Sequence, residues 1–190
     1  MIRVFVAVDL SSEALLELER FIDTLSSKRW PVRWENADKL HLTLFFVGSV
    51  EEEKIEAITN GVMRGVEGVP AFSIRMGKLG VFPDFVQPRV IWLGVKGDQP
   101  TLVHLRKQLA ERLVVAGFAD EKRAWLPHLT VGRVKKDTKY RAKRELGRQL
   151  RKLEVDEFKE ESLINQVVVY QSVLKPSGSE YRKLSEVSLE

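Results

Sequence analysis

The chain contains no cysteine in its 190 residues. Disulfides, iron–sulfur clusters and thiolate-bound zinc are therefore excluded, and a cytoplasmic location is expected. It also lacks any run of the roughly 18 apolar residues that a membrane-spanning helix needs. The first ten residues hold only a short apolar run, which ends at Asp9 without a small-residue cleavage site. We therefore expect a first β-strand there, and no signal peptide.

Neither sign of charge dominates: 31 Lys and Arg face 27 Asp and Glu, for a net charge of +4. This balance is only a weak indication of a polyanionic partner. A hydrophobic content of 44% and a charged content of 31% are typical of a globular protein. The length suits one well-buried domain, or two small lobes that share a cleft. No apolar helix face demands a partner, so we expect a monomer.

Hydrophobic periodicity predicts the same order of elements twice along the chain. Each half runs strand, helix, strand with a His-x-Thr motif, helix, strand. In the first half we expect a strand at 2–9, a helix from Ser11 or Ser12 to about Lys28, extended segments at 31–35 and 40–47, a second helix up to about 67, and a strand at 71–79. Ser49 and Glu52 have the spacing of a capping box and predict the start of that second helix.

The loop at 83–88, which contains prolines, is the best internal boundary. Beyond it we expect strands at 89–95 and 127–134, helices at 100–117 and 139–153, and strands at 157–163, 166–173 and 180–187. The repeated order predicts one bilobed domain over 1–190, built by internal duplication of pseudo-repeats at about 1–82 and 89–190.

Two of the three histidines have Thr two residues later, at His41-x-Thr43 and His128-x-Thr130. Side chains at i and i+2 of a strand point to the same face, so each motif pairs an imidazole with a hydroxyl. Aliphatic residues alternate with them and would anchor each strand in a core. Either motif alone is more often structural. Two in equivalent places indicate chemistry, whereas His104 is expected on a helix surface.

Two imidazoles with an ordinary pKa near 6.5 can act as general base and general acid at neutral pH. Threonine hydroxyls beside them can donate hydrogen bonds to phosphate oxygens as charge builds up. This combination suits cleavage of a strained phosphodiester ring and needs no metal or other cofactor. A two-histidine metal site is the alternative, but such sites normally add carboxylates or a third histidine.

At these residues the sequence resembles the 2H phosphoesterase superfamily, and within it the bacterial and archaeal RNA 2′,3′-cyclic phosphodiesterases, historically called 2′-5′ RNA ligases. Both motifs, the opening strand at 3–7, the segments 80–83 and 89–94, Tyr170 to Ser172 and Tyr181 carry the resemblance. It implies an α+β fold in which two antiparallel sheets with flanking helices face a central cleft, one motif in each lobe. It also implies hydrolysis of a 2′,3′-cyclic phosphate to a 2′-phosphate, with RNA ends or small cyclic nucleotides as substrates. His128 would act as base and His41 as acid, and the reverse order stays open.

The resemblance also implies that Arg133 contributes a cation to the phosphate. Strand parity places it on the face opposite His128, unless a bulge at Gly132 intervenes. Phe45 falls on the parity of His41 and Thr43 and would either stack a terminal base or pack between the lobes.

The helix expected at 139–153 is strongly basic, and it would either guide an RNA backbone or be a solvated face. Three further activities stay open beside cyclic phosphate hydrolysis. RNA end joining by the reverse reaction needs the same histidines. A non-catalytic RNA-binding module predicts damage to one motif, and both are intact. Metal-dependent hydrolysis would be exposed by a chelator.

Overall fold

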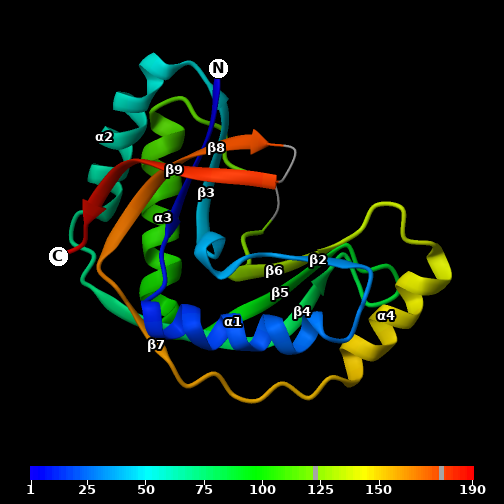
Figure 1. The fold of residues 1–190 in the computed structure, drawn as a ribbon. Helices are drawn as coiled ribbons and strands as arrows, with labels where there is room; N and C mark the ends of the chain where they lie inside the picture. The colour runs from blue at the N-terminus through cyan, green and yellow to red at the C-terminus, as the bar shows by residue number, and fades with distance from the viewer. Residues whose placement is uncertain (122–123, 176–177) are drawn as a thin grey trace.

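The protein is described by a computed structural model that covers residues 1–121, 124–175 and 178–190. Within this part of the chain the strands form two antiparallel sheets (Figure 1). Sheet A has the order β3-β1-β8-β9, with β1 at Ile2–Val8, β3 at Leu42–Val50, β8 at Gln166–Lys175 and β9 at Gly178–Ser188. Sheet B has the order β2-β6-β5-β4-β7, with β2 at Val32–Trp34, β4 at Phe72–Phe82, β5 at Val90–Gly97, β6 at His128–Val134 and β7 at Glu161–Ile164.

Each sheet combines strands from both halves of the sequence. In sheet A the strand that follows His41, β3, pairs with β1, and β1 pairs with β8 from the second half. In sheet B the strand that begins at His128, β6, pairs with β5, and β5 pairs with β4 from the first half. Both sheets thus have the same order of motif strand, first strand of the same half, and a strand from the other half. The lobes are therefore not the two halves of the chain.

The helices lie outside the two sheets, as Figure 1 shows. Helix α1 (Ser12–Ser26) contacts β2 and β7, the two edge strands of sheet B, and so crosses that sheet. Helices α2 (Ile55–Val66) and α3 (Gln99–Val115) pack on each other and along sheet A. Helix α4 (Tyr140–Lys152) lies beyond one end of sheet B. The predicted α+β class, with two antiparallel sheets and flanking helices, is confirmed.

Local sequence determines where α1 starts, whereas strand pairing determines where α2 starts. At α1, the hydroxyl of Ser11 accepts a hydrogen bond from the amide of Ala14, as predicted. The capping box proposed for Ser49 is wrong. Ser49 lies in β3 opposite Arg3 of β1, and a 3₁₀ turn, η2 (Glu52–Lys54), precedes α2 without a side-chain cap. Ladder pairing with β1 extends β3 past the point where the local signal would start a helix.

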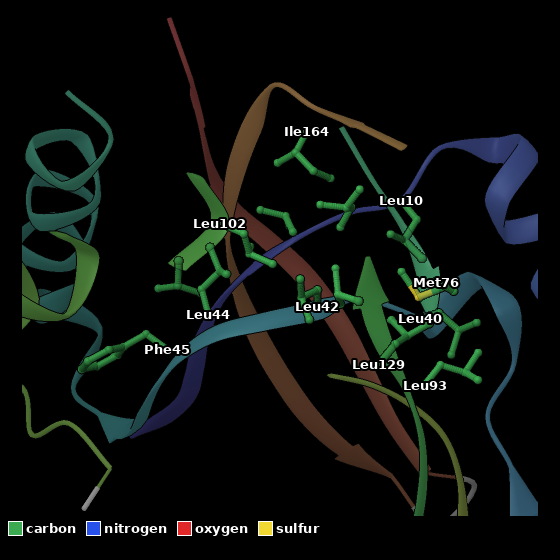
Figure 2. Packing of buried hydrophobic residues seen from close by; sticks show 14 of the residues in the cluster. Leu10, Leu40, Leu42, Leu44, Phe45, Met76, Leu93, Leu102, Leu129 and Ile164 are labelled. Atoms are coloured by element: carbon green, nitrogen blue, oxygen red, sulfur yellow. The ribbon is translucent and has the colours of Figure 1, made fainter. Parts of the chain in front are cut away.

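One continuous apolar core joins both lobes, and the motif strands contribute to it side by side. Leu42 of β3 and Leu129 of β6 are both fully buried in it (Figure 2). The alternation along β1 separates the two faces of sheet A. Val4, Val6 and Val8 belong to this core, whereas Phe5 and Ala7 belong to a smaller cluster with Val168 and Tyr170 on the opposite face. That opposite face carries the first motif.

Candidate active site

Both motif strands contain a bulge directly after the threonine. On β3, Thr43 lies opposite Ala7, and the register shifts before Phe45 lies opposite Val6. On β6, Thr130 lies opposite Trp92, and the register shifts before Gly132 lies opposite Ile91. In each strand the two residues at the bulge are both buried, which reverses the parity of the residue that follows them.

The bulge on β6 brings Arg133 onto the face of His128 and Thr130. Val131 and Gly132 are buried one after the other, and Arg133, opposite Val90, has an exposed side chain. Arg133 could lie on this face only if the strand were irregular at Gly132, and the bulge supplies that irregularity. A side chain at position 132 would overlap Trp34 and Val32 of β2, so glycine also allows the edge strand to approach closely.

The bulge on β3 moves Phe45 away from the expected face and brings Phe46 to it. Phe45 is 2% exposed and packs in the main core, with Arg106 over its ring at 5.4 Å. The prediction that Phe45 shares the face of His41 and Thr43 is wrong, and a base cannot reach its ring. Phe46 is 47% exposed and lies opposite Phe5, 6.2 Å between ring centroids. Nothing in the sequence near 44–45 signals this bulge, because neither residue is glycine.

His41 is held by its backbone and by aromatic rings. Its Nδ1–H donates to the carbonyl of Lys39 at 2.8 Å, because a carbonyl oxygen can only accept. Phe5 stacks on the imidazole at 4.7 Å, and Tyr181 of β9 meets it edge-on at 4.9 Å. The proton on Nδ1 leaves Nε2 as the nitrogen that can accept or deliver a proton.

His128 has the same local arrangement in the other sheet. Its Nδ1–H donates to the carbonyl of Leu126 at 2.8 Å, again two residues earlier in the chain. Phe82 of β4 meets the imidazole edge-on at 5.1 Å, and Trp92 of β5 lies 6.1 Å away. Both motif histidines are therefore oriented in the same way and present the same nitrogen.

Burial and nearby charged groups, among them Arg133 of β6, shift the pKa of His41. Burial is the largest cause and lowers the pKa of His41, and the guanidinium of Arg133 lowers it further. The Lys39 carbonyl and the carboxylates of Asp9 and Glu35 offset part of this, but the net pKa stays below the usual value of 6.5. Arg133 Nε lies 3.3 Å from Glu35 Oε1. The second-motif cation and its carboxylate partner thus lie close to the first-motif histidine.

A contact between backbone and side chain ties the two motifs together. Trp125, three residues before His128, donates its indole N–H to the carbonyl of Thr43 at 3.2 Å. Arg106 of α3 is buried, with its guanidinium 5.8 Å from the Trp125 ring, and forms an ion pair with Asp120 at 2.5 Å. This packing fixes the approach to β6 against β3.

The remaining sequence candidates lie elsewhere. His104 is exposed on α3 next to Gln108, as expected. In the described ranges no three His, Asp or Glu side chains form a group that could hold a metal ion. No helix in the same ranges is both long enough and apolar enough to cross a membrane.

The sequence was compared with models of known protein families. Residues 14–163 match the model of the 2′-5′ RNA ligase superfamily. The chain belongs to this superfamily. The resemblance that the two His-x-Thr motifs indicated is therefore confirmed at the level of the superfamily.

Relatives in the superfamily cover nearly the whole chain. An RNA 2′,3′-cyclic phosphodiesterase of Thermotoga maritima is 33% identical over 190 residues, which are 99% of this chain and 96% of the relative. An RNA 2′,3′-cyclic phosphodiesterase of Methanothermobacter thermautotrophicus is 36% identical over 180 residues, 95% of each chain.

Solved structures show the same fold. The crystal structure of a Thermus thermophilus protein matches with a TM-score of 0.79 at 23% identity, over 99% of this chain and 98% of that one. Escherichia coli LigT in complex with 3′-AMP matches with a TM-score of 0.74 at 24% identity, with the same coverage. Both likenesses describe the architecture of this superfamily member.

Proposed function

We propose that this protein hydrolyses 2′,3′-cyclic phosphates at RNA ends to 2′-phosphates, with His41 and His128 as its acid and base. The observation that carries the proposal is the matched orientation of the two imidazoles, each held through Nδ1 by the carbonyl two residues earlier. The RNA 2′,3′-cyclic phosphodiesterases that are 33% and 36% identical over nearly the whole chain support the substrate class.

In the proposed reaction a water molecule attacks the phosphorus in line with the bond to the 3′-oxygen. One imidazole takes a proton from the water, the P–O3′ bond breaks, and the other imidazole protonates the leaving 3′-oxygen. Thr43 and Thr130 would donate hydrogen bonds to the non-bridging oxygens, and Arg133 would exchange its contact with Glu35 for the phosphate. The two imidazoles make both proton transfers, so the scheme needs no metal.

Phe46 replaces Phe45 as the residue proposed to stack the terminal base. It is exposed, and its ring belongs to a row that runs through Phe5 to His41, so a base on Phe46 would lie near the first imidazole. Stacking on an aromatic ring is tolerant of base identity. The site would therefore accept RNA ends of different sequence.

The deciding experiment measures hydrolysis of a short RNA that ends in a 2′,3′-cyclic phosphate, with EDTA present. His41→Ala and His128→Ala should each lose about 10²- to 10⁴-fold in kcat, the usual contribution of acid–base catalysis. His104→Ala is the matched control, because this third histidine is exposed on α3. The product should be the 2′-phosphate. Turnover that survives either motif substitution, or that EDTA abolishes, would refute the proposed chemistry.

A second substrate analogue can show which histidine is the acid and which is the base. The resemblance to the family makes His128 the base and His41 the acid. The lowered pKa of His41 in the free protein favours the neutral form that a base needs, whereas a bound phosphate anion would raise this pKa again. Sulfur in place of the 3′-oxygen leaves as a thiolate with little need for protonation. This analogue should therefore rescue the substitution of the acid and leave that of the base inactive.

A further inference from the structure

Four arginines of α4 lie on one face of the helix. They stand at 141, 144, 148 and 151, and the spacing of three, four and three residues keeps them in a single row. Leu146, Gly147 and Leu150 form the buried face of the same helix. The row lines an open groove of about 410 Å³, whose other wall includes Phe85 and Val86 from the loop between β4 and β5.

This groove is built by close packing between the helix and the loop. A side chain at Gly147 would overlap the backbone carbonyl of Phe85, so glycine lets the two backbones touch. The loop itself is held by Asp84, whose carboxylate accepts hydrogen bonds from the amides of Val86 and Gln87 at 2.7 and 2.9 Å. Contacts within the protein therefore hold this second wall in place.

The arginines in the groove are positioned by rings and by one carboxylate. The guanidinium of Arg151 lies 5.2 Å from the centre of the Phe85 ring, and that of Arg144 lies 5.8 Å from Tyr140. Arg148 makes a bidentate pair with Glu145, at 2.8 and 3.0 Å. One carboxylate thus faces four guanidinium groups, and planar guanidinium groups match the geometry of phosphate oxygens.

A second groove, which shares Arg148 with the first, adds an aromatic ring to these cations. It is lined by Lys28, Trp30, Arg148, Gln149, Lys152 and Leu153. Trp30 donates its indole N–H to Gln149 at 2.6 Å, and the ammonium of Lys28 lies 5.8 Å from its ring. Cations that follow a backbone, together with rings on which bases stack, are the pattern of single-stranded nucleic acid binding.

One wall of the groove is connected to the surroundings of His128 through β4. The ring of Phe82 contacts His128, and the chain continues from Phe82 into the loop that carries Phe85. Phe82 lies opposite Val90 and Val90 lies opposite Arg133, so this loop begins beside the Arg133 end of β6. An RNA strand of several nucleotides whose end lies at His128 would run along β6 towards this loop and the arginine row.

We propose that the two grooves beside α4 bind the sugar–phosphate backbone of the RNA strand whose 3′ end is hydrolysed. This inference rests on the proposed function and deepens it, because it makes an RNA chain a better substrate than a cyclic mononucleotide. The gain arises from arginine–phosphate contacts and from stacking on Trp30, so it is sensitive to salt and tolerant of sequence.

The test compares the ratio of kcat/KM for a 12-nucleotide RNA with a cyclic phosphate end to that for 2′,3′-cyclic AMP. The variant Arg144→Glu/Arg151→Glu should lower this ratio at least about 10-fold, because two phosphate contacts are replaced by repulsion. The control Arg64→Glu/Arg112→Glu makes the same change of charge on exposed sites of α2 and α3, which pack along sheet A. Its ratio should match that of the unmodified protein.

Binding gives an answer that does not depend on hydrolysis. The dissociation constant for the same RNA with a 2′-phosphate end is measured by fluorescence anisotropy between 50 and 300 mM salt. The slope of log Kd against log salt should fall by about 1.4 in the α4 variant, at about 0.7 for each single-strand phosphate contact. An unchanged ratio and slope in a folded α4 variant would overturn the RNA groove. Failure of the unmodified protein to hydrolyse either substrate, with this slope change intact, would instead refute the proposed function alone.

Discussion

The two motif histidines share one backbone arrangement but differ in their surroundings. Each donates from Nδ1 to the carbonyl two residues earlier, so each presents Nε2. His41 is packed between Phe5 and Tyr181, and burial there disfavours the imidazolium form. The neutral form of His41 that burial favours is the form in which an imidazole can accept a proton.

The lowered pKa of His41 makes the stability of the protein depend on pH. Below about pH 6.5 the unfolded chain protonates this histidine more readily than the folded chain does, so the free energy of unfolding decreases as the pH falls. In His41→Gln this contribution is absent. Urea unfolding at pH 7 and pH 5 should therefore show a smaller loss for His41→Gln than for the unmodified protein. His104→Gln should lose as much as the unmodified protein, and equal losses in all three would contradict the burial of His41 as the cause.

The neighbouring residues Phe45 and Phe46 should respond to substitution in opposite ways. Phe45→Ala removes a fully buried ring and should lower the free energy of unfolding by about 3–5 kcal/mol. Phe46→Ala should leave stability nearly unchanged and reduce kcat/KM on RNA ends by roughly 5- to 100-fold, the value of one stacked base. Urea unfolding and initial rates on both variants give the comparison. A stable, fully active Phe46→Ala would remove Phe46 from the substrate site.

The bulged strands β3 and β6 show which side-chain orientations can be predicted from sequence alternation and which cannot. His41 with Thr43 and His128 with Thr130 precede the bulges, so alternation places each pair on one face as predicted. Beyond each bulge, simple alternation no longer predicts the face on which a residue lies. Gly132 signals the irregularity on β6, but Leu44 and Phe45 carry no such signal, because their bulge is set by pairing with β1. The capping box at Ser49 failed for the same reason.

The contact between α4 and the loop at 83–88 depends on Gly147. In an isolated helix, alanine at this position would be favoured by about 1 kcal/mol. Here the added methyl group overlaps the carbonyl of Phe85, so Gly147→Ala should instead lower the free energy of unfolding by about 1–3 kcal/mol. Arg141→Ala, on the exposed face of the same helix, should change it by less than about 0.5 kcal/mol. Urea unfolding of both variants makes the comparison, and a stabilised Gly147→Ala would mean that the loop moves freely.

At the scale of the whole molecule, the exchange of strands between the halves is the feature that linear order could not predict. Periodicity identifies the strands, and the resemblance predicts two sheets with one motif in each. Neither indicates that β8 completes the sheet of His41, or that β4 completes the sheet of His128. The orders β3-β1-β8 and β6-β5-β4 correspond to each other in the two sheets, and the internal duplication stays a prediction. The exchange of strands also makes each half depend on the other.

This dependence predicts that neither half of the chain folds alone. A fragment 1–82 retains the β1–β3 pair but loses β8 and β9 from sheet A, and it leaves β4 without β5. Two-stranded pairs are at best marginally stable in water. Fragments 1–82 and 89–190 should each lack a cooperative urea transition by circular dichroism, whereas an equimolar mixture should regain one, because mixing restores every strand of both sheets. A cooperative transition in either fragment alone would show that a half of the chain has a core of its own, and that the exchanged strands only join two domains that are already folded.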